Sequence, residues 1–188
     1  ADVLMAFGGA ISLTNPNLPP WVAREQALIR DYVDQGRRVF GVCLGSQMVA
    51  RALGAKVRRN AEPEIGWHTI ERVAGDESPL VADVFADRMT VLQWHQDTFD
   101  IPAGATQLFR SGACENQGFT IEDRVFAFQF HIEASPRTVD LFLAASDLWK
   151  RQRPFVQSRL EITRGKTLYL PQQTETLRKF LERFLRQD

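Results

Sequence analysis

A cysteine placed between two glycines, after a short apolar strand and before a helix, constrains this chain more than any other feature. The run reads Val39-Phe40-Gly41-Val42-Cys43-Leu44-Gly45-Ser46-Gln47. A turn tight enough to expose a side chain at the head of a strand has no room for Cβ atoms at its flanks, so glycine is expected on both sides. A helix predicted over 46–53 would point its N–H groups and positive dipole end at the sulfur and stabilise a thiolate. The run therefore predicts a nucleophile, although a structural turn with a buried thiol would share the pattern.

The order of elements around this turn is typical of an α/β protein. An apolar run over 3–7 predicts a strand, a polar stretch with three prolines predicts a loop, and apolar residues on one helical face predict a helix from Trp21 to Gly36. A strand over 38–42 then leads to Cys43. Because parallel neighbours need a long crossover, this order predicts a parallel sheet covered by helices.

Closely spaced strand candidates follow Gly54, at 56–58, 68–73, 90–93, 107–111, 118–122 and 125–129. The short gaps between them predict antiparallel hairpins, including a two-residue connection at Asp123-Arg124. Two further helices are predicted, one after Ser135-Pro136 and one amphipathic helix that Pro171 opens. The second half of the chain is therefore expected to extend the sheet with antiparallel strands.

The length and charge of the chain predict one compact domain, because 44% of its 188 residues are apolar. Lys plus Arg and Asp plus Glu balance at 23 each, which gives no global charge that would attract nucleic acid. Ten basic and four acidic residues lie in 150–188, so a basic tail follows an acidic body. A solvated helix face explains such a tail, and docking onto an acidic partner or a nucleotide is the alternative. The oligomeric state stays open.

The two cysteines, Cys43 and Cys114, fit neither a disulfide framework nor a Cys-x-x-Cys metal spacing, so a reducing cytoplasm is expected. No apolar run approaches the ~18 residues of a membrane span, and no signal peptide is evident. The three histidines lack the spacing of metal ligands, so no metal is expected. No cofactor is predicted either. The chain opens on Ala1 in what reads as the end of a loop, so we expect further sequence upstream.

The search for a base that could activate the cysteine is short, because the chain has three histidines. His131 ends an aromatic strand whose tip should lie at the same sheet edge as Cys43. Glu133 lies two residues further on, so in extended backbone it faces the same side and can fix the imidazole tautomer. A surface pair at a strand end would show the same His-x-Glu pattern. His95 also follows an apolar strand and fits a substrate-side or structural role, while His68 fits packing.

At this point six ordered motifs resemble those of the class I glutamine amidotransferases, the Cys-His-Glu glutaminase domains that include the amidotransferase part of GMP synthetase. The resemblance covers most of 2–149, and the Trp-His-x-Asp and Asn-Gln-x-Phe forms are typical of stand-alone members. Besides the cysteine run, the motifs are Phe7-Gly8-Gly9, Glu64-Ile65-Gly66-Trp67, Trp94-His95-Gln96-Asp97, Asn116-Gln117-Gly118-Phe119 and Gln129-Phe130-His131-Ile132-Glu133.

The resemblance implies a three-layer, flavodoxin-like fold with a central, mostly parallel sheet and antiparallel hairpins, in one domain over 1–188. Residues 1–149 would form the family core and 150–188 a basic helical extension. It implies Cys43 as nucleophile, with His131 and Glu133 completing the triad. It further implies an oxyanion hole from the N–H groups of Gly9 and Leu44, with Gln47 and His95 on the substrate side. Glutamine would be hydrolysed through a thioester to glutamate and ammonia, which a separate synthetase or acceptor subunit would use.

The chain departs from the family at three points. Ile132 and Ala10 stand where the family usually has proline, and the strand, helix and strand that usually precede the segment matching 3–7 are expected but absent from this sequence. Without them, the strand over 3–7 would be an open sheet edge. Two alternatives to a glutaminase stay open. One is hydrolysis of another γ-glutamyl amide or peptide, and the other is a catalytically silent module that keeps the fold and binds a ligand.

Overall fold

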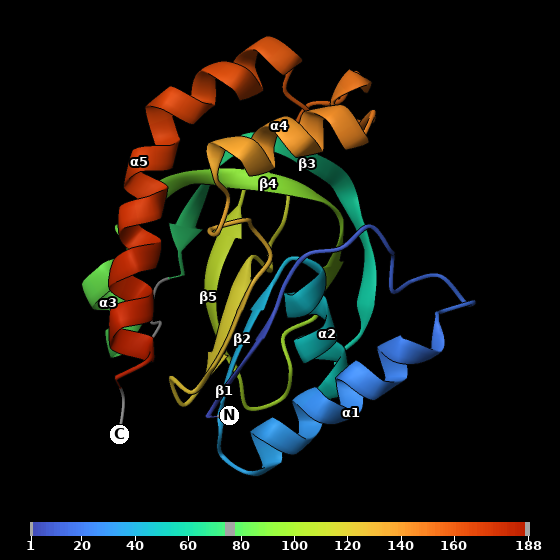
Figure 1. Ribbon diagram of the computed structural model, residues 1–188, viewed down its shortest axis with the longest axis vertical. Helices are drawn as coiled ribbons and strands as arrows, with labels where there is room; N and C mark the ends of the chain where they lie inside the picture. Colours follow the sequence, from blue (N-terminus) through green and yellow to red (C-terminus); the bar gives the residue numbers. More distant parts are fainter. Residues whose placement is uncertain (1, 74–77, 187–188) are drawn as a thin grey trace.

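The computed structural model describes residues 2–73 and 78–186, and its elements surround one seven-stranded sheet (Figure 1). The strand order across the sheet is β1-β2-β7-β6-β5-β3-β4. In chain order the elements are β1 (Val3–Ala6), α1 (Pro20–Asp34), β2 (Arg38–Val42), α2 (Leu44–Ala52), β3 (Val57–Arg72), α3 (Pro79–Val84), β4 (Arg88–Phe99), β5 (Thr106–Ser111), β6 (Gly118–Ile121), β7 (Val125–Phe128), α4 (Pro136–Ala145), η1 (Leu148–Lys150) and α5 (Arg159–Phe184). The α/β class predicted from the sequence is confirmed.

The parallel part of the sheet is smaller than expected. Strand β2 pairs in parallel with β1 on one side and with β7 on the other, whereas the remaining four pairings are antiparallel. The expectation of a mostly parallel sheet is therefore corrected. The reason is the length of the connections between strands. The short connection between β6 and β7 suffices for an antiparallel hairpin but not for the crossover that parallel strands need. Of the three parallel-paired strands, β2 leads to the cysteine turn, β7 leads to His131, and β1 leads to the loop that contains Gly8 and Gly9.

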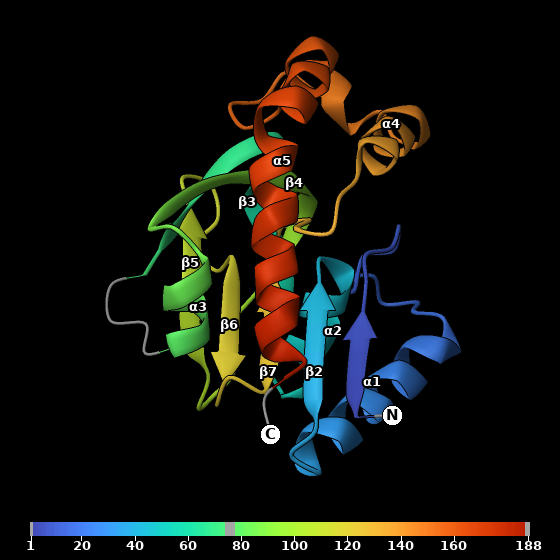
Figure 2. The ribbon, with the colours of Figure 1, turned by 60° about the vertical axis from the view of Figure 1, so that its left-hand side comes forward.

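Helices cover both faces of the sheet, with α1 and α2 on one side and α3 and α5 on the other (Figures 1 and 2). The layers follow from the period of two along β2 and β7, which turns successive side chains to opposite faces. The α3 and α5 side includes Phe40, Phe126, Phe128, Phe180 and Phe184. The α1 and α2 side includes Val22, Ile29, Val39, Met48, Val49, Val125 and Ala127.

Strands β3 and β4 form one long, curved hairpin rather than the short strands that the sequence predicted (Figure 1). The register shifts between Arg59 and Glu64, a segment that contains Pro63. Proline cannot donate to the ladder, so an irregularity is where a strand tolerates it. The curved end of the hairpin carries a third apolar cluster with α4 and α5, which includes Trp67, Leu92 and Leu143.

Helix α5 begins at Arg159, and Pro171 lies inside it, which corrects the expectation that Pro171 opens this helix. Its start is a capping box in which Ser158 and Glu161 satisfy each other's backbone N–H groups. Phe180 and Phe184 stack on each other against the sheet. This shared packing supports the proposal that the chain forms one domain; residues 187–188 of the expected extension lie outside the described residues.

No helix within 2–73 and 78–186 is both long enough and apolar enough to span a bilayer.

Candidate active site

Cys43 occupies a backbone conformation that side chains rarely adopt, with φ of 53° and ψ of −111° between β2 and α2. Such a conformation costs on the order of 1–3 kcal/mol and persists where the surroundings over-determine it. The N–H of Cys43 donates to the carbonyl of Phe128 at 2.8 Å, which ties the turn to β7. The carbonyl of Cys43 accepts from the Ser46 hydroxyl at 2.6 Å and from the Gln47 N–H at 3.1 Å. Hydrogen bonds on both sides thus hold the strained residue.

The two flanking glycines are required by close backbone packing. A Cβ on Gly41 would lie 2.8 Å from the carbonyl carbon and oxygen of Gly45. A Cβ on Gly45 would lie 2.1 Å from the carbonyl oxygen of Ala6, at the end of β1. Real Cβ atoms do not approach backbone this closely, so the glycine spacing in the sequence reflects direct contact between the turn and its neighbours.

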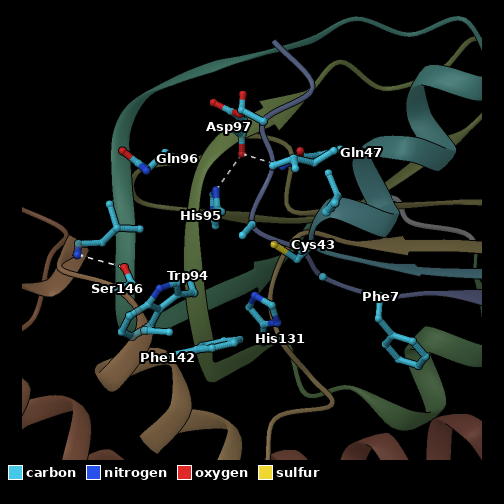
Figure 3. A pocket seen from close by; sticks show the side chains of 18 of the residues that line it. Phe7, Cys43, Gln47, Trp94, His95, Gln96, Asp97, His131, Phe142 and Ser146 are labelled. Atoms are coloured by element: carbon cyan, nitrogen blue, oxygen red, sulfur yellow. Dashed lines mark hydrogen bonds between the residues drawn. The ribbon is translucent and has the colours of Figure 1, made fainter. Parts of the chain in front are cut away.

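His131 lies directly beside Cys43 (Figure 3). His131 Nδ1 donates to Glu133 Oε1 at 2.8 Å, which leaves the other ring nitrogen for the sulfur. Burial alone lowers the pKa of His131, but the negative charges of Cys43 and Glu133, with their hydrogen bonds, raise it to about 10. The imidazole ring is therefore protonated at neutral pH, with Glu133 hydrogen-bonded to one ring nitrogen.

The backbone of His131 is fixed from two sides. Its N–H donates to the carbonyl of Leu92 in β4 at 2.8 Å. Gln173, fully buried in α5, donates from Nε2 to the His131 carbonyl at 3.0 Å and accepts the Leu92 N–H at Oε1 at 2.9 Å. Sequence reasoning missed Gln173. The signal was a polar residue two positions after Pro171, on the helical face that also carries Leu170 and Phe180.

A glycine loop after β1 covers the cysteine. A Cβ on Gly8 would lie 3.0 Å from His131 Cε1 and 3.7 Å from Cys43 Cβ. A Cβ on Gly9 would lie 2.7 Å from the Leu44 side chain. Leu44 is the first residue of α2, and its N–H belongs to the helix-end groups that have no partner within the helix. The loop and the helix end are therefore adjacent at the cysteine, where two N–H donors can converge.

A cavity of about 680 Å³ lies beside Cys43. All seven residues predicted for the site line it: Gly9, Cys43, Leu44, Gln47, His95, His131 and Glu133. The other walls come from the rest of the loop after β1, from β3 and β4, from α4 and from η1. Figure 3 shows Cys43 and His131 between Gln47 and Asp97 on one side and Trp94 and Phe142 on the other.

Gln47 and His95 meet at one backbone atom (Figure 3). The carbonyl of Asp97 accepts from Gln47 Nε2 at 3.3 Å and from His95 Nδ1 at 3.0 Å. Gln47 Nε2 also donates to Gln129 Oε1 at 3.1 Å. His95 Nε2 lies 3.1 Å from Glu64 Oε2. Both ring nitrogens of His95 thus face oxygen acceptors, which fixes the orientation of the ring.

Glu64 is the centre of a buried polar network behind the cavity. Its carboxylate accepts from Ser111 Oγ at 2.7 Å and from Gln117 Nε2 at 2.6 Å, in addition to facing His95. Glu64, His95 and Cys114 each have an atom that could bind a metal ion, and these three atoms lie within 4.8 Å of one another. Hydrogen bonds already occupy them, because Cys114 donates to Thr98 Oγ1 at 3.2 Å. Within the described residues, this group therefore acts as a hydrogen-bonded support for the cavity wall.

Cys114 and His68 lie in different surroundings from Cys43 and His131. Burial raises the pKa of the Cys114 thiol to about 11, and Cys114 is not among the residues that line the cavity. Burial likewise lowers the pKa of His68, whose Nε2 lies 3.2 Å from the carbonyl of Ile65. The thiol of Cys114 is therefore separate from the group that Cys43, His131 and Glu133 form at the cavity.

Comparison with known proteins agrees with this geometry. Residues 5–150 match the family model for glutamine amidotransferase class-I. The chain is 38% identical over 143 residues to the putative glutamine amidotransferase-like protein YfeJ of Salmonella typhimurium, covering 74% of this chain and 59% of YfeJ. It is 31% identical over 136 residues to a GMP synthase of Vibrio atlanticus, covering 71% of this chain and 24% of that enzyme.

The chain is also similar in structure to a solved glutamine amidotransferase. The crystal structure of a glutamine amidotransferase from Thermotoga maritima superposes with a TM-score of 0.81 and 33% identity, over 99% of this chain and 79% of that one. The fold with its cysteine turn defines the class, and the chain belongs to the class I glutamine amidotransferase family.

Proposed function

We propose that this protein is a cysteine-dependent glutamine amidohydrolase in which Cys43 is the nucleophile, His131 the acid and base, and Glu133 the residue that orients His131. The observation that supports it best is the place of the His131 ring, which lies beside Cys43 at a strained turn inside the cavity and is hydrogen-bonded to Glu133 at 2.8 Å. Family membership supports the reaction class.

The proposed reaction starts from a Cys43 thiolate and a protonated His131. The Cys43 thiolate attacks the γ-carboxamide carbon and forms a C–S bond, while the carbonyl electrons move to oxygen. His131 gives its proton to the amide nitrogen, the C–N bond breaks, and ammonia leaves. Water then attacks the thioester and gives a proton to His131, and the C–S bond breaks to release glutamate. The second step restores the thiolate and the imidazolium.

The oxyanion of both tetrahedral intermediates needs donors placed in advance. We propose the N–H groups of Gly9 and Leu44, which the close contact between these residues supports. One donor follows the nucleophile in the chain and the other comes from the loop beside it. Removing one such donor typically lowers kcat by about 10²–10³-fold.

The α-amino acid end of glutamine fits the side of the cavity near Gln47 and His95. Arg59 is the one Lys or Arg among the described residues that line the cavity, and its Nη1 pairs with Asp97 Oδ1 at 3.2 Å. A zwitterionic α-carbon presents one charge of each sign, which this pair complements. We propose that Gln47 and His95 act on the substrate side by holding the Asp97 carbonyl in place between them.

The ammonia is proposed to serve a synthetase on a separate subunit or domain, in a cytoplasmic setting. The relatives support this, because the part of the Vibrio atlanticus GMP synthase that this chain matches is 24% of that enzyme. No metal or cofactor is required by the steps above.

The direct test is the release of ammonia and glutamate from L-glutamine by the intact protein and by Cys43→Ala. We expect turnover only with Cys43 present. Cys114→Ala is the matched control, because it removes the other buried cysteine, away from the cavity, and should retain turnover. Equal release by both cysteine variants would remove Cys43 from the mechanism. Heat of glutamine binding without turnover in the intact protein would instead indicate a silent binding module.

A further inference from the structure

The cavity has two chemically different ends, and the proposed reaction uses only one of them. The polar end contains Gln47, Arg59 and Asp97. The opposite end is lined by Trp94 of β4, Phe142 and Ala145 of α4, and Leu148 of η1, with Thr138 and Ser146 beside them. Figure 3 shows Trp94 and Phe142 together, on the far side of Cys43 from Gln47.

The apolar end adjoins the acid of the reaction. The rings of His131 and Phe142 meet edge to face with centroids 4.9 Å apart, and Phe142 meets Trp94 at 5.3 Å. His131 must reach the departing nitrogen to protonate it. Any group attached to that nitrogen therefore extends from His131 along Phe142 toward Trp94, while the glutamyl part extends toward Gln47.

Ammonia makes no use of such a wall, because it carries no carbon that could be removed from water. The cavity volume of about 680 Å³ falls in the range typical of sites for drug-sized ligands, roughly 300–1,000 Å³. The wall is also fixed in place, since Trp94, Phe142 and Leu148 pack against the third apolar cluster. A rigid, preformed apolar surface beside the leaving group is a binding subsite rather than a gap.

We propose that the apolar end, formed by Trp94, Phe142, Ala145 and Leu148, is a subsite for the leaving amine, and that the substrates include γ-glutamyl amides of apolar primary amines. This inference rests on the proposed thioester mechanism and specifies its substrate class. The C–S bond forms, the C–N bond breaks, and the His131 proton goes to the nitrogen, so that an alkylamine leaves in place of ammonia. Water completes the cycle and releases glutamate as before.

The test compares kcat/KM for L-glutamine and γ-L-glutamyl-n-butylamide, measured by glutamate release. Burying each methylene is worth about fourfold, so the butylamide is expected to exceed glutamine by tenfold or more. Phe142→Ala and Leu148→Ala should lower kcat/KM for the butylamide about tenfold more than for glutamine. The ratio of the two kcat/KM values is compared between variants, because any effect of Phe142 on His131 itself should change both substrates equally and cancel. Leu141→Ala is the matched control, because Leu141 is an exposed residue of α4 outside the cavity lining.

Each outcome decides a different point. Glutamine turnover with a butylamide that falls short of a tenfold higher kcat/KM overturns the subsite and leaves the proposed function intact. A preferred butylamide whose advantage survives both alanine variants overturns the assignment of the subsite to these side chains. A folded protein that hydrolyses neither compound overturns the proposed function itself and this inference with it.

Discussion

Gln173 holds the carbonyl of His131 with one end of its side-chain amide while the other end holds the N–H of Leu92. A helix more than forty residues away in the chain thereby fixes the backbone of the proposed acid and base. The amide fits because it carries both a donor and an acceptor, and Gln173 is fully buried. Helix α5 therefore contributes to the site through this residue as well as to the core.

Replacing Gln173 by leucine should weaken both stability and catalysis. The change leaves the buried Leu92 N–H unpaired, which costs about 1–3 kcal/mol, and removes one of the two donors to the His131 carbonyl, which keeps the Ala134 N–H at 3.2 Å. The shift of His131 should lower kcat by about tenfold or more with a smaller effect on KM. Urea unfolding and steady-state kinetics measure the two effects. Gln172→Leu, at the exposed neighbouring position, is the control and should change neither. An unchanged kcat in Gln173→Leu would show that Gln173 supports only the fold.

Gly45→Ala should disrupt the cysteine turn, because its Cβ would lie 2.1 Å from the Ala6 carbonyl oxygen. Overpacking of this kind typically costs about 1–3 kcal/mol and shifts the backbone. We expect most activity to be lost. Gly54→Ala provides the comparison: Gly54 has φ of 86° with open space around it, so alanine strains the backbone by about 1 kcal/mol without touching the site. Similar activity in the two variants would contradict the role of the close contact.

The two cysteines should differ sharply in alkylation. Burial holds the pKa of Cys114 at about 11, so at pH 8 only about one Cys114 in a thousand is thiolate, the form that reacts. Cys43 lines the cavity next to the protonated ring of His131. Iodoacetamide at pH 8 should therefore modify Cys43 first, as peptide mapping by mass spectrometry would show. Faster labelling of Cys114 in the folded protein would overturn this assignment.

The pH dependence should follow the proton on His131. Its pKa is raised to about 10, so the imidazolium is present throughout the neutral range and is lost as the pH rises through that value. Because the imidazolium protonates the departing nitrogen, kcat/KM should fall on the alkaline side near pH 10. In Glu133→Gln the charge of Glu133, which helps to raise the pKa of His131, is removed, so the fall should begin at lower pH.

A pH profile of kcat/KM from pH 6 to pH 10.5 measures this shift. Glu115→Gln, at an exposed position outside the cavity lining, is the matched control and should keep the profile of the intact protein. An identical alkaline limb in Glu133→Gln would show that Glu133 does not interact with the proton of His131.

The sequence predicted the cysteine turn well because its determinants are local. Two glycines four residues apart report directly on the contacts that their missing Cβ atoms would make. The pairing of His131 with Glu133 was also local, since only one residue, Ile132, separates them. The seven predicted site residues accordingly line a single cavity.

Features that depend on distant partners were missed. Glu64 was part of a recognised motif, but its role as acceptor for Ser111 and Gln117 depends on strands that meet only in the folded sheet. Pro171 was expected to open a helix because proline favours first turns, yet the capping box at Ser158 and Glu161 sets the start twelve residues earlier. Gln173 had no local signal beyond its polarity, because its two partners lie in other elements.

The adjacency of β2 and β7 also governs when the site can form during folding. Phe40 of β2 pairs with Phe126 of β7, 86 residues further along the chain, and four strands occupy the interval. Contacts of such high sequence separation form only after much loop-closure entropy has been lost. The cysteine turn can be made early from neighbouring residues, but His131 reaches it only when β7 docks, and Gln173 arrives later still in the chain. Recovered hydrolytic activity after dilution from denaturant is therefore a readout of the completed topology, which secondary structure alone would not report.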